Sequence, residues 1–153
     1  MKLTDYTDYT LRTLIFLGLH RNEQVTIQQI ADGYDISKNH LMKIIHRLSL
    51  DGLVETTRGR SGGVRLRKPP DEINIGQVVR AAEQEFVLVE CFSRVNNRCV
   101  LSPVCELQAT FRDALEAFFA VLDKRTLADI LRNAEEVRPY IRLRGVTVRA
   151  ENA

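Results

Sequence analysis

The pattern of apolar and polar residues predicts two helices at the start of the chain. Apolar residues recur at helical spacing over residues 9–19, and Thr7 or Asp8 is the candidate N-cap of this helix. Thr26 and Gln29 then match a capping box, in which each side chain bonds the backbone of the other residue. We therefore expect a second, short helix to begin after Thr26.

A third helix and two short strands follow. Ser37 can cap this helix and Gly52 can end it. Residues 53–57 and 64–66 are typical of strands, and the glycine-rich segment between them is typical of a hairpin tip. A short helix, a tight turn, a longer helix and a hairpin are the parts of a winged helix-turn-helix. The sequence therefore predicts a mainly α fold with a small β-hairpin wing.

The second half of the chain is predicted to contain a loop and a long helix. Pro69 and Pro70 mark a boundary, because paired prolines end regular structure. The strongest helical stripe covers residues 107–122, and its aromatic side chains would be poorly covered in a monomer. We expect a dimerisation helix there, with a role in the core alone as the alternative. The predicted parts are a winged helix-turn-helix domain (1–68), a loop with the dimerisation helix (69–133) and a flexible tail (134–153).

Composition and charge narrow the class of protein. The chain is 44% apolar and 27% charged, as in ordinary soluble proteins, and it has no apolar run of membrane-spanning length and no signal-peptide core. We therefore expect a cytoplasmic protein with reduced thiols. Residues 1–68 hold eleven Lys and Arg against seven Asp and Glu, whereas residues 69–153 hold eleven against thirteen. A basic patch is usually a solvated surface, but one with glycines inside it favours nucleic acid.

The predicted third helix and hairpin carry the candidate contacts to double-stranded DNA. Recognition helices place their N-terminal residues at base edges, where Asn39 can bridge two atoms of adenine and Lys38 can donate to guanine. Glycines in the hairpin let the backbone approach DNA closely, and arginines suit phosphates or a narrow minor groove. The alternatives are the polar face of a surface helix and an ordinary glycine-rich turn. The candidate DNA-binding residues are Gln28, Ser37, Lys38, Asn39, His40, Lys43, Arg58, Arg60, Ser61, Gly62 and Gly63.

All three cysteines of the chain fall in one short segment, as Cys91, Cys99 and Cys105. Turn-forming residues separate them, so the backbone can bring the thiols together. An odd number of cysteines in one loop favours a bound metal or cluster over a disulfide framework, and thiolates are ligands of iron–sulfur clusters and of zinc. The gaps of seven and five residues are wider than the C-x-x-C spacing of zinc sites, which disfavours zinc. The alternative is three free buried thiols.

Four motifs in this order resemble one known family. Together they are similar to the bacterial winged-helix iron–sulfur transcription regulators, over roughly residues 1–133. The motifs are Leu3-Thr4-x-x-Thr7-Asp8-Tyr9-x-Leu11-Arg12, Ser37-x-Asn39-His40-Leu41-x-Lys43-Ile44, Arg58-Gly59-Arg60-x-Gly62-Gly63-Val64-x-Leu66 and the three spaced cysteines.

The resemblance implies a homodimeric repressor that binds operator DNA and an iron–sulfur cluster, 4Fe-4S with 2Fe-2S as the alternative. The chain is nearest to the nitric-oxide-sensing branch, in which three cysteines and an Asp of the partner subunit hold the cluster, and Asp8 matches that position. Stabilisation of a helix N-terminus is the other reading of Asp8. Another branch uses a His soon after the third cysteine, where this chain has Glu106, Leu107 and Gln108. The wide first cysteine gap resembles an iron-regulating branch, so an iron-responsive or cluster-status-responsive regulator is the alternative.

An enzyme, such as an oxidoreductase or a thiol peroxidase, is the remaining class. The sequence shows no set of nucleophile, base and orienting residue. Its glycine-rich segment lies between two predicted strands, whereas a phosphate-cradling loop opens a helix. We therefore expect no enzymatic activity.

Overall fold

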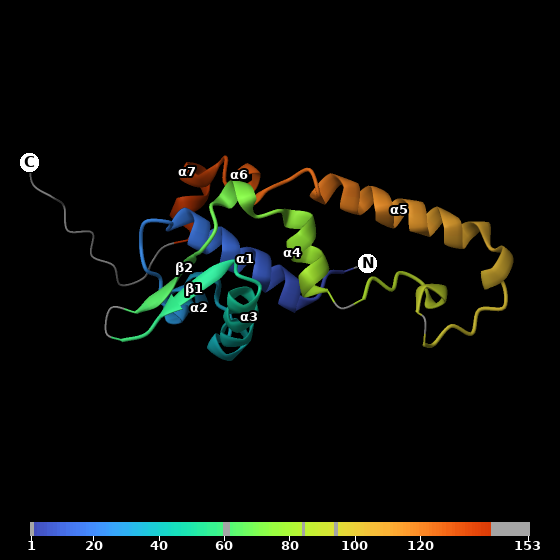
Figure 1. Ribbon diagram of the computed structural model, residues 1–153, viewed down its shortest axis with the longest axis horizontal. Coiled ribbons are helices and arrows are strands. Elements are labelled where there is room, and N and C mark those ends of the chain that lie inside the picture. Colours follow the sequence, from blue (N-terminus) through green and yellow to red (C-terminus); the bar gives the residue numbers. More distant parts are fainter. Residues whose placement is uncertain (1, 60–61, 84, 94, 142–153) are drawn as a thin grey trace, which may run out of the picture.

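A computed structural model of the protein describes residues 2–59, 62–83, 85–93 and 95–141. Helices and one β-hairpin form a packed body, and one long helix extends away from it (Figure 1). The predicted mainly α fold with a hairpin wing is confirmed. The first elements are α1 (Asp5–Leu19), α2 (Ile27–Tyr34), α3 (Lys38–Leu50), β1 (Val54–Thr57) and β2 (Gly63–Leu66).

Local capping explains where the first helices begin. Thr4 caps α1 by accepting a hydrogen bond from the backbone N–H of Thr7, so the prediction of Thr7 or Asp8 as the cap is wrong. The helix starts one turn earlier than expected, because its first turn is polar and carries no apolar stripe. The capping box of Thr26 with Gln29 is confirmed. Ser37 occupies the N-cap position of α3 as expected, but its side chain makes no capping hydrogen bond in the described structure.

The two strands pair antiparallel and are fixed to the helices. Val54 lies opposite Leu66, and Thr57 lies opposite Gly63. Val25, just before α2, joins the same sheet through two backbone bonds with Val64, of 3.2 and 2.7 Å. The hairpin is therefore attached on the helix-turn-helix side and does not hang free.

Residues after Pro69 build part of the same core. The later elements are η1 (Pro70–Glu72), α4 (Ile75–Ala82), η2 (Glu90–Phe92), η3 (Ser102–Val104), α5 (Glu106–Leu122), α6 (Leu127–Ile130), α7 (Ala134–Val137) and η4 (Arg138–Tyr140). Helices α4 and α6 pack against α1, and Ile73, Val79 and Leu127 are buried with Leu14 and Phe16. The core thus crosses the boundary that the two prolines indicate, because prolines end local structure without deciding which surfaces pack.

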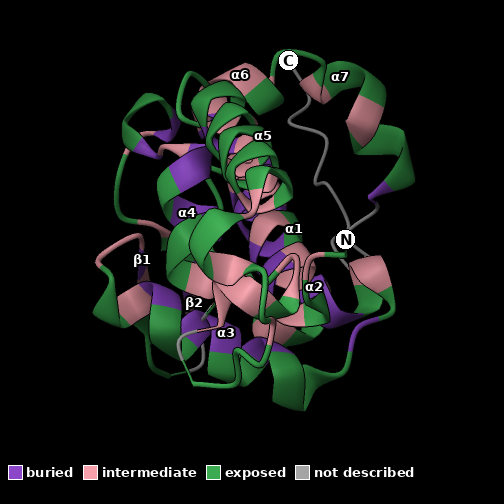
Figure 2. Cartoon of the chain, turned by 90° about the vertical axis from the view of Figure 1, so that its right-hand side faces the viewer, coloured by how far each residue is buried: buried purple, intermediate pink, exposed green. Residues whose placement is uncertain are grey.

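The long helix α5 and the segment before it form what we call the cysteine arm, the described part of residues 85–122. Of the seventeen residues of α5 only Phe119, near its inner end, is buried. In Figure 2, α5 is coloured as exposed and intermediate, whereas buried (purple) stretches lie in helices of the body such as α1, α3 and α4. A clamp holds the inner end: both terminal nitrogens of the Arg80 guanidinium bond the Asp123 carboxylate, one at 2.8 Å. The guanidinium carbon lies 4.0 Å from the Phe119 ring centroid.

The C-terminal region begins with ordered turns. The segment predicted to be a flexible tail contains α7 and η4, and Ile141 is buried. Residues 142–153 lie outside the described residues. Within the part of the chain that the structure describes, no helix has the length and apolar character needed to cross a bilayer.

Candidate functional site

The outer end of the cysteine arm brings the three thiols to one cavity. Cys91 comes from η2, Cys99 from the following loop and Cys105 from the start of α5, and all three are free and half-buried. The cavity measures about 270 Å³. Its other lining residues are mainly apolar: Val89, Glu90, Leu101, Leu107, Gln108 and Phe111.

Hydrogen bonds within the arm fix the backbone around these cysteines. Gln108 donates from Nε2 to the carbonyl oxygen of Cys91 at 3.2 Å, which ties the first cysteine to α5. The Glu90 carboxylate accepts from the backbone N–H of Arg98 at 2.7 Å, and the Asn97 side chain accepts from the N–H of Cys99 at 3.0 Å. The loop is therefore closed by its own polar groups, as the turn-forming residues predicted.

The start of α5 adds a favourable electrostatic environment. Cys105 occupies the N-cap position, and its side chain makes no capping hydrogen bond in the described structure. The first N–H groups of a helix lack intrahelical partners and carry partial positive charge, so they stabilise anions.

The residues present fit an iron–sulfur cluster. Three thiols on one largely apolar cavity, beside a helix N-terminus, match the thiolate ligands and negative charge of such a group. Within the described ranges, no three His, Cys, Asp or Glu side chains are grouped closely enough to hold a single metal ion. A cluster with four protein ligands would need one ligand besides these three cysteines.

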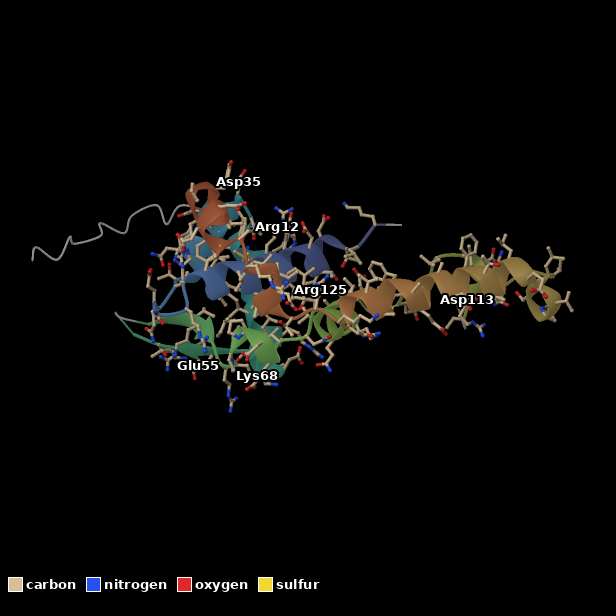
Figure 3. The ribbon with its side chains drawn as sticks, turned by 90° about the horizontal axis from the view of Figure 1, so that it is seen from above. Arg12, Asp35, Glu55, Lys68, Asp113 and Arg125 are labelled. Carbon is tan, nitrogen blue, oxygen red and sulfur yellow. The ribbon has the colours of Figure 1, made fainter. Side chains whose placement is uncertain are left out.

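Asp8 lies on α1 in the body and does not line the cysteine cavity. Its carboxylate forms an ion pair with Arg12, with distances of 2.7 and 3.1 Å to two guanidinium nitrogens. In Figure 3 the Arg12 label lies over the body, whereas Asp113 lies far out along α5. One chain therefore does not bring Asp8 to its own thiols.

The predicted recognition helix presents its polar residues to solvent. Leu41, Ile44 and Ile45 of α3 are buried, whereas Lys38 and Asn39 are exposed. The other exposed candidates here are Ser37, His40 and Lys43 on α3 or next to it, and Gln28 on α2. The Gln28 amide already donates to the Asp32 carboxylate at 2.8 Å, and the His40 ring lies 6.2 Å from that of Tyr9.

The hairpin glycines have a reason within the fold as well. A Cβ at Gly62 would lie 2.3 Å from the carbonyl oxygen of Thr57, and one at Gly63 would lie 2.9 Å from that of Val25. Both positions therefore need glycine whether or not DNA is bound. Arg58 is exposed, and the predicted DNA contacts Arg60 and Ser61 lie outside the described residues.

Sequence reasoning missed Gln108 as a part of this site. In the sequence it stands only where another branch of the family has a ligating His, yet its side chain lines the cavity and bonds the Cys91 carbonyl. Its spacing of three residues from Cys105 on a helix was the available signal, because residues three apart share a helix face.

Comparison with known proteins places the chain among bacterial regulators. The profile of the Rrf2 family, described as an iron-dependent transcriptional regulator, matches residues 3–133. The chain is 54% identical to the HTH-type transcriptional regulator NsrR of Bacillus subtilis (strain 168), over 94% of this chain and 99% of that protein. It is 55% identical to the NsrR of Bacillus licheniformis, over 92% of this chain and 99% of that protein.

Solved structures agree with this relationship. The structure of T. potens IscR superposes with a TM-score of 0.72 at 25% identity, covering 90% of this chain and 91% of that chain. The structure of CymR, the global cysteine regulator of B. subtilis, superposes with a TM-score of 0.65 at 29% identity, covering 85% and 95%. The chain belongs to the Rrf2 family of iron-dependent transcriptional regulators, and its fold is that of a DNA-binding winged helix-turn-helix.

Proposed function

We propose that the protein is a homodimeric, cytoplasmic transcription repressor whose affinity for operator DNA is controlled by an iron–sulfur cluster that senses nitric oxide. The observation that carries this proposal is the single cavity lined by Cys91, Cys99 and Cys105. High identity to regulators named NsrR, and the resemblance to the nitric-oxide-sensing branch, support the choice of signal.

The cluster ligands would come from two chains. The three thiolates of one arm would hold a 4Fe-4S cluster, with 2Fe-2S as the alternative, and Asp8 of the partner subunit would supply the remaining ligand. Such a cluster supplies iron that reacts with nitric oxide, most readily where the ligand is a carboxylate, a harder ligand than a thiolate. To reach this position Asp8 has to leave its ion pair with Arg12.

The exposed arm supports a dimer. Val100 and Val104 are 89% and 81% exposed, and Leu107 is 59% exposed, all at the outer end of the arm. Apolar groups gathered in this way are typical of a surface that a second chain covers. A dimer would place two α3 helices on successive major-groove faces of a two-fold-related operator, with Lys38, Asn39 and Lys43 toward the bases or phosphates.

The switch would act through the link between subunits. When Asp8 of the partner subunit leaves the site, Asp8 returns to Arg12 and the arm is no longer tied to the second chain. The two recognition helices then lose their fixed spacing, and operator affinity falls. A signal can shift this equilibrium only if it distinguishes the two states, and an inter-subunit ligand does so.

Operator binding before and after nitric oxide tests the proposal. The dimer is purified without oxygen, and its affinity for an operator fragment is measured at one fixed salt concentration, because phosphate contacts make affinity salt-dependent. We expect affinity to fall on addition of the gas, and unchanged affinity would rule the switch out. Asp8→Ala should leave the fold nearly intact and change cluster stability or the nitric oxide response. If neither property changes, Asp8 is not a cluster ligand and only stabilises the start of α1 electrostatically.

An iron-responsive regulator is the second candidate, favoured by the description of the family as iron-dependent. In that case loss of the cluster on iron depletion is the signal. Depleting iron in the absence of nitric oxide separates the two: release of the operator under depletion alone, with no release by the gas, favours this second candidate.

A further inference from the structure

Glu83 joins the end of α4 to the start of α1, two places that are far apart in the sequence. Its carboxylate oxygen Oε1 accepts hydrogen bonds from the backbone N–H of Thr4 at 2.7 Å and from the Thr4 hydroxyl at 3.0 Å. Glu83 is the C-cap of α4 and stands two residues before the start of the cysteine arm, and Thr4 is the N-cap of α1. Figure 1 shows the chain leaving α4 beside the N-terminal end of α1.

Thr4 in turn bonds Asp8, the predicted cluster ligand on α1. The carbonyl oxygen of Thr4 accepts from the backbone N–H of Asp8 at 3.0 Å, as the first bond of the helix. Holding Thr4 therefore fixes the turn that presents Asp8. On the other side, seven residues separate Glu83 from Cys91. One carboxylate thus lies between the two groups of residues that the proposed site needs.

The Glu83 carboxylate is well stabilised in this position. Burial alone would raise its pKa, but hydrogen bonds from Thr7 and Thr4 outweigh burial, and the pKa lies below the ordinary value. A carboxylate at a helix N-terminus is further stabilised by the partial positive charge there. The bond is therefore charge-assisted near neutral pH, and it is stronger than a bond between neutral groups.

We propose that Glu83 is a positioning residue that couples the cysteine arm to the recognition helix of its own subunit. This inference rests on the proposed function. Two polar contacts lie where the arm meets the body: Arg80 with Asp123 at the inner end of α5, and Glu83 with Thr4 just before residue 85. The first contact joins α5 to α4, which itself packs against α1, whereas the second reaches the N-cap of α1 directly.

The attachment to α1 matters because α1 packs directly against α3. Leu14 and Leu17 of α1 are fully buried in the core that also holds Leu41 and Ile44 of α3. A shift at the start of the cysteine arm that displaces Glu83 therefore moves the first turn of α1. Because the core between α1 and α3 is close-packed, a movement of α1 also moves α3. Without Glu83, the direct polar link between the start of the arm and the first turn of α1 is lost, and only packing joins the two.

The test compares operator affinity with and without the cluster in full-length dimers. The measured quantity is the ratio of operator Kd between the cluster-free and the cluster-loaded protein, at fixed salt. Couplings between sites are commonly about 5- to 150-fold, and we expect Glu83→Ala to reduce the ratio by about fivefold or more. Glu85→Ala is the matched control: it removes the same charge two residues further along, at the start of the cysteine arm, where the hydrogen bonds and ion pairs among the described residues do not involve Glu85. We expect this control to keep the ratio of the wild-type protein.

A second variant guards against a general loss of structure. Glu83→Asp keeps the charge but withdraws the carboxylate from Thr4, so it should also lower the ratio while thermal unfolding stays close to that of the control. An unchanged ratio in Glu83→Asp and Glu83→Ala overturns the coupling role, and so does an equal loss in Glu85→Ala. A wild-type protein whose operator affinity ignores the cluster overturns the proposed function itself, which is a distinguishable result.

Discussion

The body and the cysteine arm are built on different principles. The body surrounds α1 with buried side chains, and Leu14, Phe16 and Ile30 have no exposed surface. The outer arm holds its shape through short loop hydrogen bonds and leaves residues such as Val100 almost fully exposed. The body therefore folds on its own hydrophobic core, whereas the arm needs something else to cover it. Under the proposed function, sensing and folding therefore depend on different regions, and substitutions should reveal the separation.

Loss of one thiol should have the largest effect on sensing and little effect on the body. Cys99→Ser removes a thiolate from the cavity and should abolish cluster binding. The substitution is outside the core, so the free energy of unfolding of the cluster-free protein should stay within about 0.5 kcal/mol of the wild-type value. Iron and sulfide content together with urea unfolding measure the two effects. A variant with the full iron and sulfide content would show that Cys99 is not a cluster ligand.

A core substitution in the body should have the opposite profile. Phe16→Ala removes a fully buried ring that contacts α2 near Gly33, and it should lower the free energy of unfolding by about 3–5 kcal/mol. Val100→Ala in the arm is the control, with an expected change within about 0.5 kcal/mol. Urea unfolding of cluster-free protein compares them. Similar losses in both variants would mean that the arm is as much a part of the core as the body is.

The sequence predicted the body better than it predicted the junction with the arm. Helical stripes and the Thr26 capping box are local signals, and they located α2 and α3. The sequence did not reveal the start of α1 because its first turn is polar, and Thr7, which is buried there, looks like a surface residue.

The site could be predicted from the sequence only where local patterns determine it. Three cysteines in one short segment are a local pattern, and their common cavity follows from the turns between them. The bond from Thr4 to Glu83 spans 79 residues and depends on how α1 and α4 pack, which no local pattern reveals. The proposed participation of Asp8 would also depend on a second chain.

A substitution at the junction should have an intermediate effect. A Cβ at Gly76 would lie 2.0 Å from a carboxylate oxygen of Asp123, so Gly76→Ala should displace Asp123 from Arg80 and destabilise the protein by about 1–3 kcal/mol. Urea unfolding measures the change. Combining it with Asp123→Ala should recover part of the loss, because the clash is then removed. If the losses in free energy of unfolding of the two single variants simply add in the double variant, Gly76→Ala does not clash with the Asp123 side chain.

The smallest expected effect is a pH dependence confined to the body. Burial lowers the pKa of His20 from its ordinary value of 6.5, although Glu23 at 3.7 Å opposes the shift, and neither ring nitrogen has a hydrogen-bond partner among the described residues. His20 therefore binds a proton more readily in the unfolded chain than in the folded chain, so the free energy of unfolding should fall as the pH drops below about 6.5. Carboxylates with lowered pKa, such as Glu83, lose their contribution only at lower pH, below their ordinary value of 4.5.

Unfolding in urea at pH 7.5 and pH 5.5 measures this dependence. His20→Gln should make the stability nearly equal at the two pH values. A difference that persists in the variant would assign the dependence to other groups. The exposed His40 and His46 of α3 provide matched substitutions that should leave the dependence in place.

The most direct measurement is the absorbance and Mössbauer spectrum of protein prepared without oxygen, taken for the wild-type chain and for Asp8→Ala. The proposed function predicts a brown protein whose iron is bound mainly by sulfur, with one iron atom whose signal changes when Asp8 is replaced. A colourless wild-type protein without iron, prepared under the same conditions, would contradict the claim that these three thiols hold an iron–sulfur cluster.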